Sequence, residues 1–188
     1  MDELEKKLSQ VLKSQTQVES VGGSFVNAAA VLILFVNVSD EWNIVYTRRT
    51  NNVRTHQGEV SFPGGAYEPE DASMVSTALR ETYEEIGIKP ECIRILGGLD
   101  PVRTISNFTV YPYVGILECE PTFLINFNEV ERVFMIPLKW LTDPLNFYEQ
   151  DHLVEQQFIR RVVHYNDFEG EHLWGLTARI TQQLLEIQ

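Results

Sequence analysis

A glycine turn followed closely by a glutamate-rich helix, at residues 62 to 88, constrains this chain more than any other feature. The turn is Phe62-Pro63-Gly64-Gly65, which indicates a strand that ends in a tight turn. The helix ends in Arg80-Glu81-x-x-Glu84-Glu85-x-Gly87-Ile88, so three carboxylates fall within five residues. Like charges this close are unfavourable in a helix, and a bound divalent cation would relieve them.

The helix is predicted to span Ala72 to Ile86, with Asp71 suited to cap its start and Gly87 to end it. Its apolar positions recur at helical spacing and are Val75, Ala78, Leu79, Thr82 and Ile86. At roughly 100° per residue, the three glutamates then share one flank. Repulsion between Glu81 and Glu85 costs about 0.2 to 0.5 kcal/mol, which Mg²⁺ or Mn²⁺ would reverse. Arg80 lies one turn before Glu84 and can orient it.

Each half of this feature also has an ordinary structural explanation. A glutamate-rich helix face is often simply solvated, and a Gly-Gly pair is often a hairpin turn. Here the two lie one loop apart, and Gly65 has no side chain to keep its carbonyl away from a metal or phosphate. Their combination therefore favours a metal site.

These residues resemble the Nudix box, the signature of the Nudix hydrolases, which reads G-x5-E-x7-R-E-U-x-E-E-x-G-U with U aliphatic. The chain supplies Gly65, Asp71 in place of the first Glu, Arg80, Glu81, Glu84, Glu85, Gly87 and Ile88. It departs at Thr82, which is not aliphatic, and in having fourteen rather than thirteen residues between Gly65 and Arg80. The resemblance implies an α/β Nudix fold, an α/β/α sandwich with a mixed sheet. It also implies metal ligands, which are Glu81, Glu84, Glu85 and the Gly65 carbonyl; we assign Asp71 no metal role.

The segment before the box resembles the coenzyme A pyrophosphatase branch of this family, whose signature reads L-L-T-x-R-S-x3-R-x3-G-x3-F-P-G-G. The spacing is kept, and the identities are Thr47, Arg49, Arg54, Gly58, Phe62, Pro63, Gly64 and Gly65. Val45, Tyr46 and Thr50 replace the two leading leucines and the serine. The expanded box and the segments 127–138 and 173–180 also look like this branch, so the resemblance covers most of the chain from about residue 25.

This resemblance implies hydrolysis of the pyrophosphate of coenzyme A or its thioesters, giving 4′-phosphopantetheine or its acyl form and adenosine 3′,5′-bisphosphate. The charged pyrophosphate repels an attacking water, so the reaction needs cations at the phosphates and a base. Mg²⁺ or Mn²⁺ would be the cofactor. Arg49 and Arg54 can bind phosphate oxygens in bidentate fashion, with a surface ion pair as the alternative. His56, Gly58 and Gly64 complete the predicted substrate contacts.

The general base and the substrate both leave alternatives open. The base is Glu85 inside the box, or Glu129 or Glu131 outside it. The substrate could be another nucleoside diphosphate derivative, such as ADP-ribose, a dinucleotide or a damaged nucleotide. The chain lacks the S-Q-P-W-P-F-P-x-S run that follows the box in NADH-cleaving relatives. A non-catalytic Nudix module that senses a ligand is the third alternative, which the three retained box glutamates disfavour.

Composition predicts one domain over residues 1–188, with a helical extension at 1–20 and the box at 65–88. A net charge of −12 disfavours nucleic acid and leaves a small phosphorylated substrate as the expected partner. The apolar run Ala28–Val36 is too short to span a membrane, and the first residues lack the positive charge of a signal peptide, so we expect no membrane association and a cytoplasmic location. Cys92 and Cys119 show neither a metal motif nor a disulfide framework. The sequence leaves the oligomeric state open, and a homodimer is among the states that it allows.

Hydrophobic periodicity predicts an amphipathic helix over residues 2–16 and a last helix from about Thr177 to Ile187. Strands are predicted near 26–37, 43–48, 93–103, 110–118 and 132–137. The alternation is not the regular βαβ pattern of a doubly wound sheet. Aromatic residues at 108–113 and 147–148 are expected to pack in the core or in hairpins, with stacking on adenine as the alternative.

Overall fold

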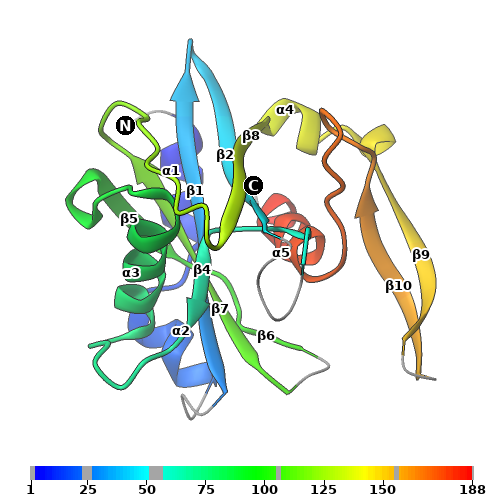
Figure 1. The fold of residues 1–188 in the computed structure, drawn as a ribbon, viewed down its shortest axis with the longest axis horizontal. Helices are drawn as coiled ribbons and strands as arrows, with labels where there is room; N and C mark the ends of the chain where they lie inside the picture. Colours follow the sequence, from blue (N-terminus) through cyan, green and yellow to red (C-terminus); the bar gives the residue numbers. More distant parts are fainter. Residues whose placement is uncertain (1–2, 23–26, 51–56, 105–106, 155–156, 188) are drawn as a thin grey trace.

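The computed structural model describes residues 3–22, 27–50, 57–104, 107–154 and 157–187. The elements follow one another along the chain as shown in Figure 1: α1 (Glu3–Val11), α2 (Gln15–Gly22), β1 (Ala28–Val38), β2 (Glu41–Arg49), β3 (Val60–Ser61), β4 (Gly64–Ala66), α3 (Met74–Ile86), the 3₁₀ turn η1 (Pro90–Cys92), β5 (Ile93–Gly98), β6 (Val102–Arg103), β7 (Thr109–Leu117), β8 (Val130–Pro137), α4 (Leu138–Leu141), the 3₁₀ turn η2 (Pro144–Asn146), β9 (Phe147–Val154), β10 (Gln157–Tyr165) and α5 (Gly175–Glu186).

The main sheet is mixed and is built around β1. Its strands run in the order β3-β2-β1-β7-β5, while β4 pairs with β1, β6 with β7 and β8 with β2. β1 and β7 are parallel, and the other pairs are antiparallel. β9 and β10 form a separate two-stranded sheet, which lies to one side of the main sheet in Figure 1.

Helices cover both faces of this sheet because β1 is apolar on both of its faces. Ile33 and Phe35 belong to a core with α1 and α5, whereas Leu32 and Leu34 belong to a second core with α2 and α3. This separation follows from the alternation of side chains along a strand. The α/β/α sandwich with a mixed sheet that the sequence predicted is therefore confirmed.

Two predicted elements are each divided in the structure. The helix predicted over residues 2–16 is divided into α1 and α2, because Lys13 leaves the helix and exchanges two backbone hydrogen bonds with Gly98, at 3.0 and 2.9 Å. The strand predicted near 93–103 is likewise interrupted after Gly98 and resumes at Val102. No helix among the described residues combines the length and apolar character that crossing a bilayer requires.

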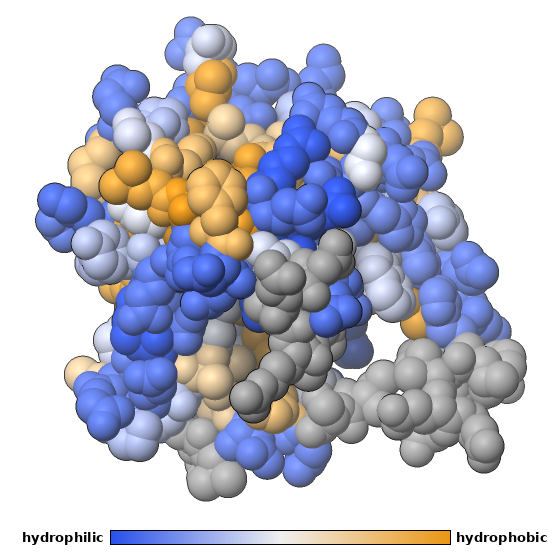
Figure 2. All heavy atoms as spheres, viewed as in Figure 1, coloured by the Kyte–Doolittle hydropathy of each residue, from blue (hydrophilic) through white to orange (hydrophobic). Residues whose placement is uncertain are grey.

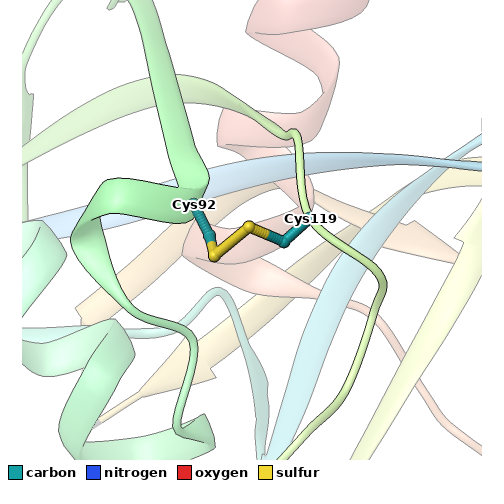
Figure 3. Close-up of a disulfide and its surroundings, with 2 residues drawn as sticks. All are labelled: Cys92 and Cys119. Atoms are coloured by element: carbon teal, nitrogen blue, oxygen red, sulfur yellow. A yellow bond between two sulfur atoms is a disulfide. The ribbon is translucent and has the colours of Figure 1, made fainter.

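Cys92 and Cys119 form a disulfide, with an S–S distance of 2.15 Å and Cα atoms 5.3 Å apart (Figure 3). The prediction that these cysteines lack a disulfide arrangement is wrong. They meet because β5 and β7 are antiparallel neighbours in which Ile93 lies opposite Leu117, so residues 27 positions apart come together at the strand ends. Sequence spacing alone does not reveal such a pairing.

Candidate active site

The glutamate helix α3 begins two residues later than predicted. Its N-cap is Ser73 rather than Asp71, and Ser73 and Ser76 form a reciprocal capping box. Gly87 ends the helix in the left-handed conformation at φ 74°, as the sequence predicted. Because the helix is continuous from Met74 to Ile86, the extra residue of the box is accommodated before its first turn.

Asp71 holds the box arginine instead of capping the helix. Its carboxylate accepts hydrogen bonds from Nε and Nη2 of Arg80 at 2.9 and 3.0 Å, and from the Thr77 hydroxyl at 2.8 Å. The Arg80 guanidinium is the main reason that the pKa of Asp71 is lowered to about 2. The loop before α3 is thus fixed to the helix by a two-pronged ion pair.

Arg80 also connects the helix to β4. Its Nη1 donates to Glu81 Oε1 at 2.9 Å and to Glu84 Oε2 at 3.0 Å, while Nη2 donates to the carbonyl of Ala66 at 3.1 Å. The orientation of Glu84 by Arg80 was predicted from their one-turn spacing. The contacts of Arg80 with Glu81 and with β4 depend on the fold and were not predicted.

We expect Asp71→Asn to lower the free energy of unfolding by about 3 kcal/mol at neutral pH, because it leaves Arg80 without its bidentate partner. The pKa of Asp71 lies below its ordinary value of 3.8, so its contribution is complete above about pH 4 and is lost as the pH falls toward 2. Urea unfolding of both proteins across this pH range measures the difference, which should narrow on acidification. Asp40→Asn, in an exposed turn, removes the same charge and should change stability little; an equal loss there would contradict the assignment.

Glu85 is the most buried of the three box glutamates, with 1% of its surface exposed. Its Oε2 accepts a hydrogen bond from the Gly64 N–H at 3.2 Å, and its Oε1 lies 3.5 Å from Nη1 of Arg49. Burial raises the pKa of Glu85 to about 8, although these two donors lower it. The three glutamates differ in exposure along the flank that they were predicted to share, because the side chain of Glu84 is 49% exposed and Glu85 faces inward.

Glu81 lies directly against the glycine turn. A Cβ atom built on Gly65 would fall 2.4 Å from the carboxyl carbon of Glu81, so any larger residue at 65 would displace this carboxylate. Burial raises the pKa of Glu81, and the Arg80 guanidinium opposes that effect. Gly65 is therefore packed against a carboxylate of the box, and the approach of its carbonyl to a metal or phosphate stays a prediction.

Glu129 and Glu131 point to different parts of the molecule. The Glu129 carboxylate repels those of Glu81 and Glu85 and raises the pKa of both, so it lies near the box. Glu131 instead pairs with Nε of Arg48 at 3.4 Å. Two residues spaced by two normally share a strand face, but Glu131 falls at a bulge where the β2–β8 register shifts, which separates their directions.

Asn126 was not among the predicted site residues. Its Nδ2 donates to Glu129 Oε1 at 3.3 Å, and its backbone N–H donates to the carbonyl of Glu85 at 2.9 Å. It therefore connects the candidate base to the last turn of α3. In the sequence, the only sign that Asn126 could contact the candidate base is its position three residues before Glu129.

The upstream signature divides into structural residues and site residues. Thr47 is buried and its hydroxyl contacts that of Ser61 at 3.1 Å, while Phe62 stacks on Tyr46 with ring centroids 4.9 Å apart. These contacts hold β2, β3 and the glycine turn together. Gly58 adopts φ 69° in the turn before β3, a conformation that glycine accepts readily. The predicted residues Arg54 and His56 lie outside the described residues.

The site carries more negative than positive charge. The carboxylates of Glu81, Glu84, Glu85 and Glu129 surround it, and Arg80 and Arg49 are the cations that contact box glutamates in the described part of the chain.

No group of three His, Cys, Asp or Glu side chains among the described residues is already arranged as a metal site, because Arg80 bridges Glu81 and Glu84 while Glu85 turns to Gly64. The predicted donors are carboxylate oxygens and one backbone carbonyl oxygen, which suit Mg²⁺ or Mn²⁺. The residues therefore fit such an ion, and the ligand set of Glu81, Glu84, Glu85 and the Gly65 carbonyl stays a prediction.

Comparison with known proteins agrees with the fold and the box. The NUDIX domain family model matches residues 26–158. An uncharacterized Nudix hydrolase NudL of Pectobacterium atrosepticum is 38% identical over 141 residues, which cover 75% of this chain and 72% of that protein. The NudL of Yersinia pestis (strain Pestoides F) is 34% identical over 163 residues, covering 87% and 81%.

Among solved structures, a MutT/nudix family protein from Enterococcus faecalis aligns with a TM-score of 0.54 at 14% identity, covering 85% of this chain and 60% of that one. A C. elegans Ap4A hydrolase binary complex gives a TM-score of 0.51 at 18% identity, covering 59% and 80%. A sandwich of this topology with a glutamate box on α3 defines a Nudix domain. The chain belongs to the Nudix hydrolase family, whose enzymes act on nucleoside diphosphate derivatives and generally use divalent metal ions.

Proposed function

We propose that this enzyme hydrolyses the pyrophosphate of coenzyme A or its thioesters. The observation that carries the proposal is the meeting of the upstream signature and the box at one carboxylate. Arg49 and Gly64, both from the signature, contact the two oxygens of Glu85 at 3.5 and 3.2 Å. A signature that converges on the metal-binding box has the position needed to select the substrate.

In the proposed reaction, water attacks one phosphorus of the pyrophosphate and the bridging P–O bond breaks. The water oxygen stays on that phosphorus, and the bridging oxygen leaves with the other phosphate. The products are 4′-phosphopantetheine, or its acyl form, and adenosine 3′,5′-bisphosphate. Bound Mg²⁺ or Mn²⁺ would be held by Glu81, Glu84 and Glu85 and would stabilise the negative charge that develops on the phosphates.

Glu129 is the base that we favour for this reaction. Glu129 lies beside the box but is not one of the predicted metal ligands, and Asn126 Nδ2 donates a hydrogen bond to its carboxylate. A base must take a proton from the attacking water at hydrogen-bond distance, which requires such a fixed position. Glu131 pairs with Arg48 and contacts none of the box glutamates among the described residues.

Arg49 is proposed to bind a phosphate oxygen. Its side chain is 24% exposed, and its 3.5 Å contact with Glu85 is long for a charged hydrogen bond, so a phosphate could compete for the same guanidinium. Arg54 and His56 are proposed to contact the substrate through their places in the signature. The 3′-phosphate of coenzyme A would then distinguish it from substrates that carry the pyrophosphate alone.

We propose that residues 1–188 act as one domain, because Leu8 of α1 and Val18 of α2 belong to the two cores of the sheet. We also propose a cytoplasmic location, where coenzyme A is abundant. An alternative substrate among nucleoside diphosphate derivatives, or a ligand-sensing role, is tested by the same experiment.

We expect metal-dependent release of adenosine 3′,5′-bisphosphate when the purified protein is incubated with coenzyme A and Mg²⁺ or Mn²⁺. Mass spectrometry of the products, with dephospho-coenzyme A, ADP-ribose and NADH as comparison substrates and a chelator as control, measures it. Dephospho-coenzyme A should be clearly poorer, because it lacks the 3′-phosphate. Turnover of another diphosphate without coenzyme A cleavage would reject the substrate, and no turnover of any of the four would favour the sensing role.

A further inference from the structure

We infer that the Cys92–Cys119 disulfide is a reversible redox site that sets how firmly the Glu129 loop is held against α3. The Glu129 loop is defined here as residues 118–129, which connect β7 to β8 and cross the front of the molecule in yellow-green in Figure 1. Cys119 is exposed near the start of this loop, and Cys92 is half-buried in η1. The disulfide therefore joins the loop to the segment that directly follows the glutamate helix (Figure 3).

The loop is further attached to the last turn of α3. The N–H of Leu124 donates to the carbonyl of Ile86, and that of Asn126 to the carbonyl of Glu85, both at 2.9 Å. These carbonyls belong to the helix end, where no partner exists within the helix itself. Gly87 allows the close approach, because a Cβ atom there would lie 2.5 Å from Cβ of Leu124. The position of Glu129 thus depends on how the loop lies on α3.

Apolar burial holds the loop at Phe123, which is partly buried against the second core, but supports the residues that follow it less. Leu124 and Phe127 are 72% and 70% exposed, and Figure 2 shows hydrophobic side chains at the surface of this face. A segment with few buried apolar contacts opens at a low free-energy cost. A covalent link at Cys119 restricts that opening by removing conformations that the loop would otherwise visit. The oxidation state of the disulfide therefore controls how readily the loop opens.

Reduction of the Cys92–Cys119 disulfide requires a dithiol reductant. Its thiolate attacks the exposed sulfur of Cys119, the S–S bond breaks, and Cys92 leaves as a thiolate that takes up a proton. The second thiol of the reductant then displaces Cys119, so the reductant becomes a disulfide and both cysteines become thiols. Two electrons pass from the reductant to the protein. In the reducing cytoplasm that we propose for this enzyme, disulfides are usually transient, catalytic or redox-sensing, in agreement with a reversible role.

The test compares the oxidised wild-type protein, the same protein reduced with dithiothreitol, and the Cys92→Ser/Cys119→Ser double variant. Alkylation and mass spectrometry first establish the thiol state of each sample. We expect residues 119–129 to exchange amide hydrogen about tenfold faster in the reduced protein and in the double variant than in the oxidised protein. Because the role in catalysis rests on the proposed function, hydrolysis is measured separately. We expect kcat to fall about fivefold on reduction with KM unchanged, and the double variant to be insensitive to dithiothreitol.

The outcomes separate the redox site from the proposed function. Equal exchange of residues 119–129 in the oxidised and reduced wild-type protein would overturn the inference, whatever the activity. Faster exchange with an unchanged kcat would overturn control of catalysis by the loop. If no nucleoside diphosphate is cleaved in either state, the proposed function fails, while the exchange measurement still decides the redox site. The comparison needs no variant that folds, because the wild-type protein supplies both states.

Discussion

Glu85→Gln is expected to lower kcat for pyrophosphate hydrolysis about a thousandfold while leaving the fold intact. Glu85 is buried against Gly64 and Arg49, and burial raises its pKa to about 8, so a carboxylate here is costly without a cation. The amide of glutamine preserves the shape and can still accept the Gly64 N–H. It removes the negative charge that a metal ion would bind. Steady-state kinetics with Mg²⁺ measures kcat, and thermal unfolding measures the fold.

A second measurement distinguishes metal binding from other roles of Glu85. Mn²⁺ should raise the Tm of the wild-type protein, because an ion that binds the folded state stabilises it. The increase should be much smaller in Glu85→Gln. Glu91→Gln, at an exposed position in η1, removes the same charge and should keep both kcat and the Mn²⁺ effect. Wild-type turnover by Glu85→Gln would reject the assignment of Glu85 to the metal site.

The parts of the fold that the sequence predicted are those in which local pattern and burial agree. The apolar run Ala28–Val36 lies within β1, which is buried between two helical layers, and α5 was placed to within two residues. The β9–β10 hairpin was missed. Its strands carry charged residues such as Glu149 and Arg161, which pair with each other across the hairpin, so no apolar alternation marked it. Val163 and Tyr165 at the end of β10 belong to the core, but two apolar positions are too short a pattern to predict a strand.

The candidate site was predicted where spacing along one helix decides the contact. The pairing of Arg80 with Glu84 and the stop at Gly87 are both local and are both confirmed. The inward direction of Glu85 was not predicted, because it depends on how β4 packs against α3. The different directions of Glu129 and Glu131 depend on a bulge opposite β2, and such an irregularity leaves no periodic signal in the sequence.

Glu129→Gln is expected to lower kcat by about a hundredfold to a thousandfold, the range typical for loss of a general base. Glutamine can still accept the hydrogen bond from Asn126 Nδ2, which is 3.3 Å from Glu129 Oε1, so the loop should keep its place. The Mn²⁺-induced rise in Tm should also be kept, because Glu129 is outside the proposed ligand set. In Glu129→Gln, kcat should therefore fall as it does in Glu85→Gln. The Mn²⁺-induced rise in Tm should be kept, whereas Glu85→Gln should lose most of it.

Glu131→Gln is the matched control, since it removes the same charge two residues away. Its partner Arg48 also lies 3.7 Å from Glu171, so the guanidinium keeps one carboxylate when Glu131 is neutralised. We expect kcat within about twofold of the wild-type value, because exposed ion pairs contribute little. A large fall in Glu131→Gln with near wild-type turnover in Glu129→Gln would reverse the assignment. Near wild-type turnover in both variants would leave Glu85 as the base, and the bulge that separates Glu129 from Glu131 would then have no part in the chemistry.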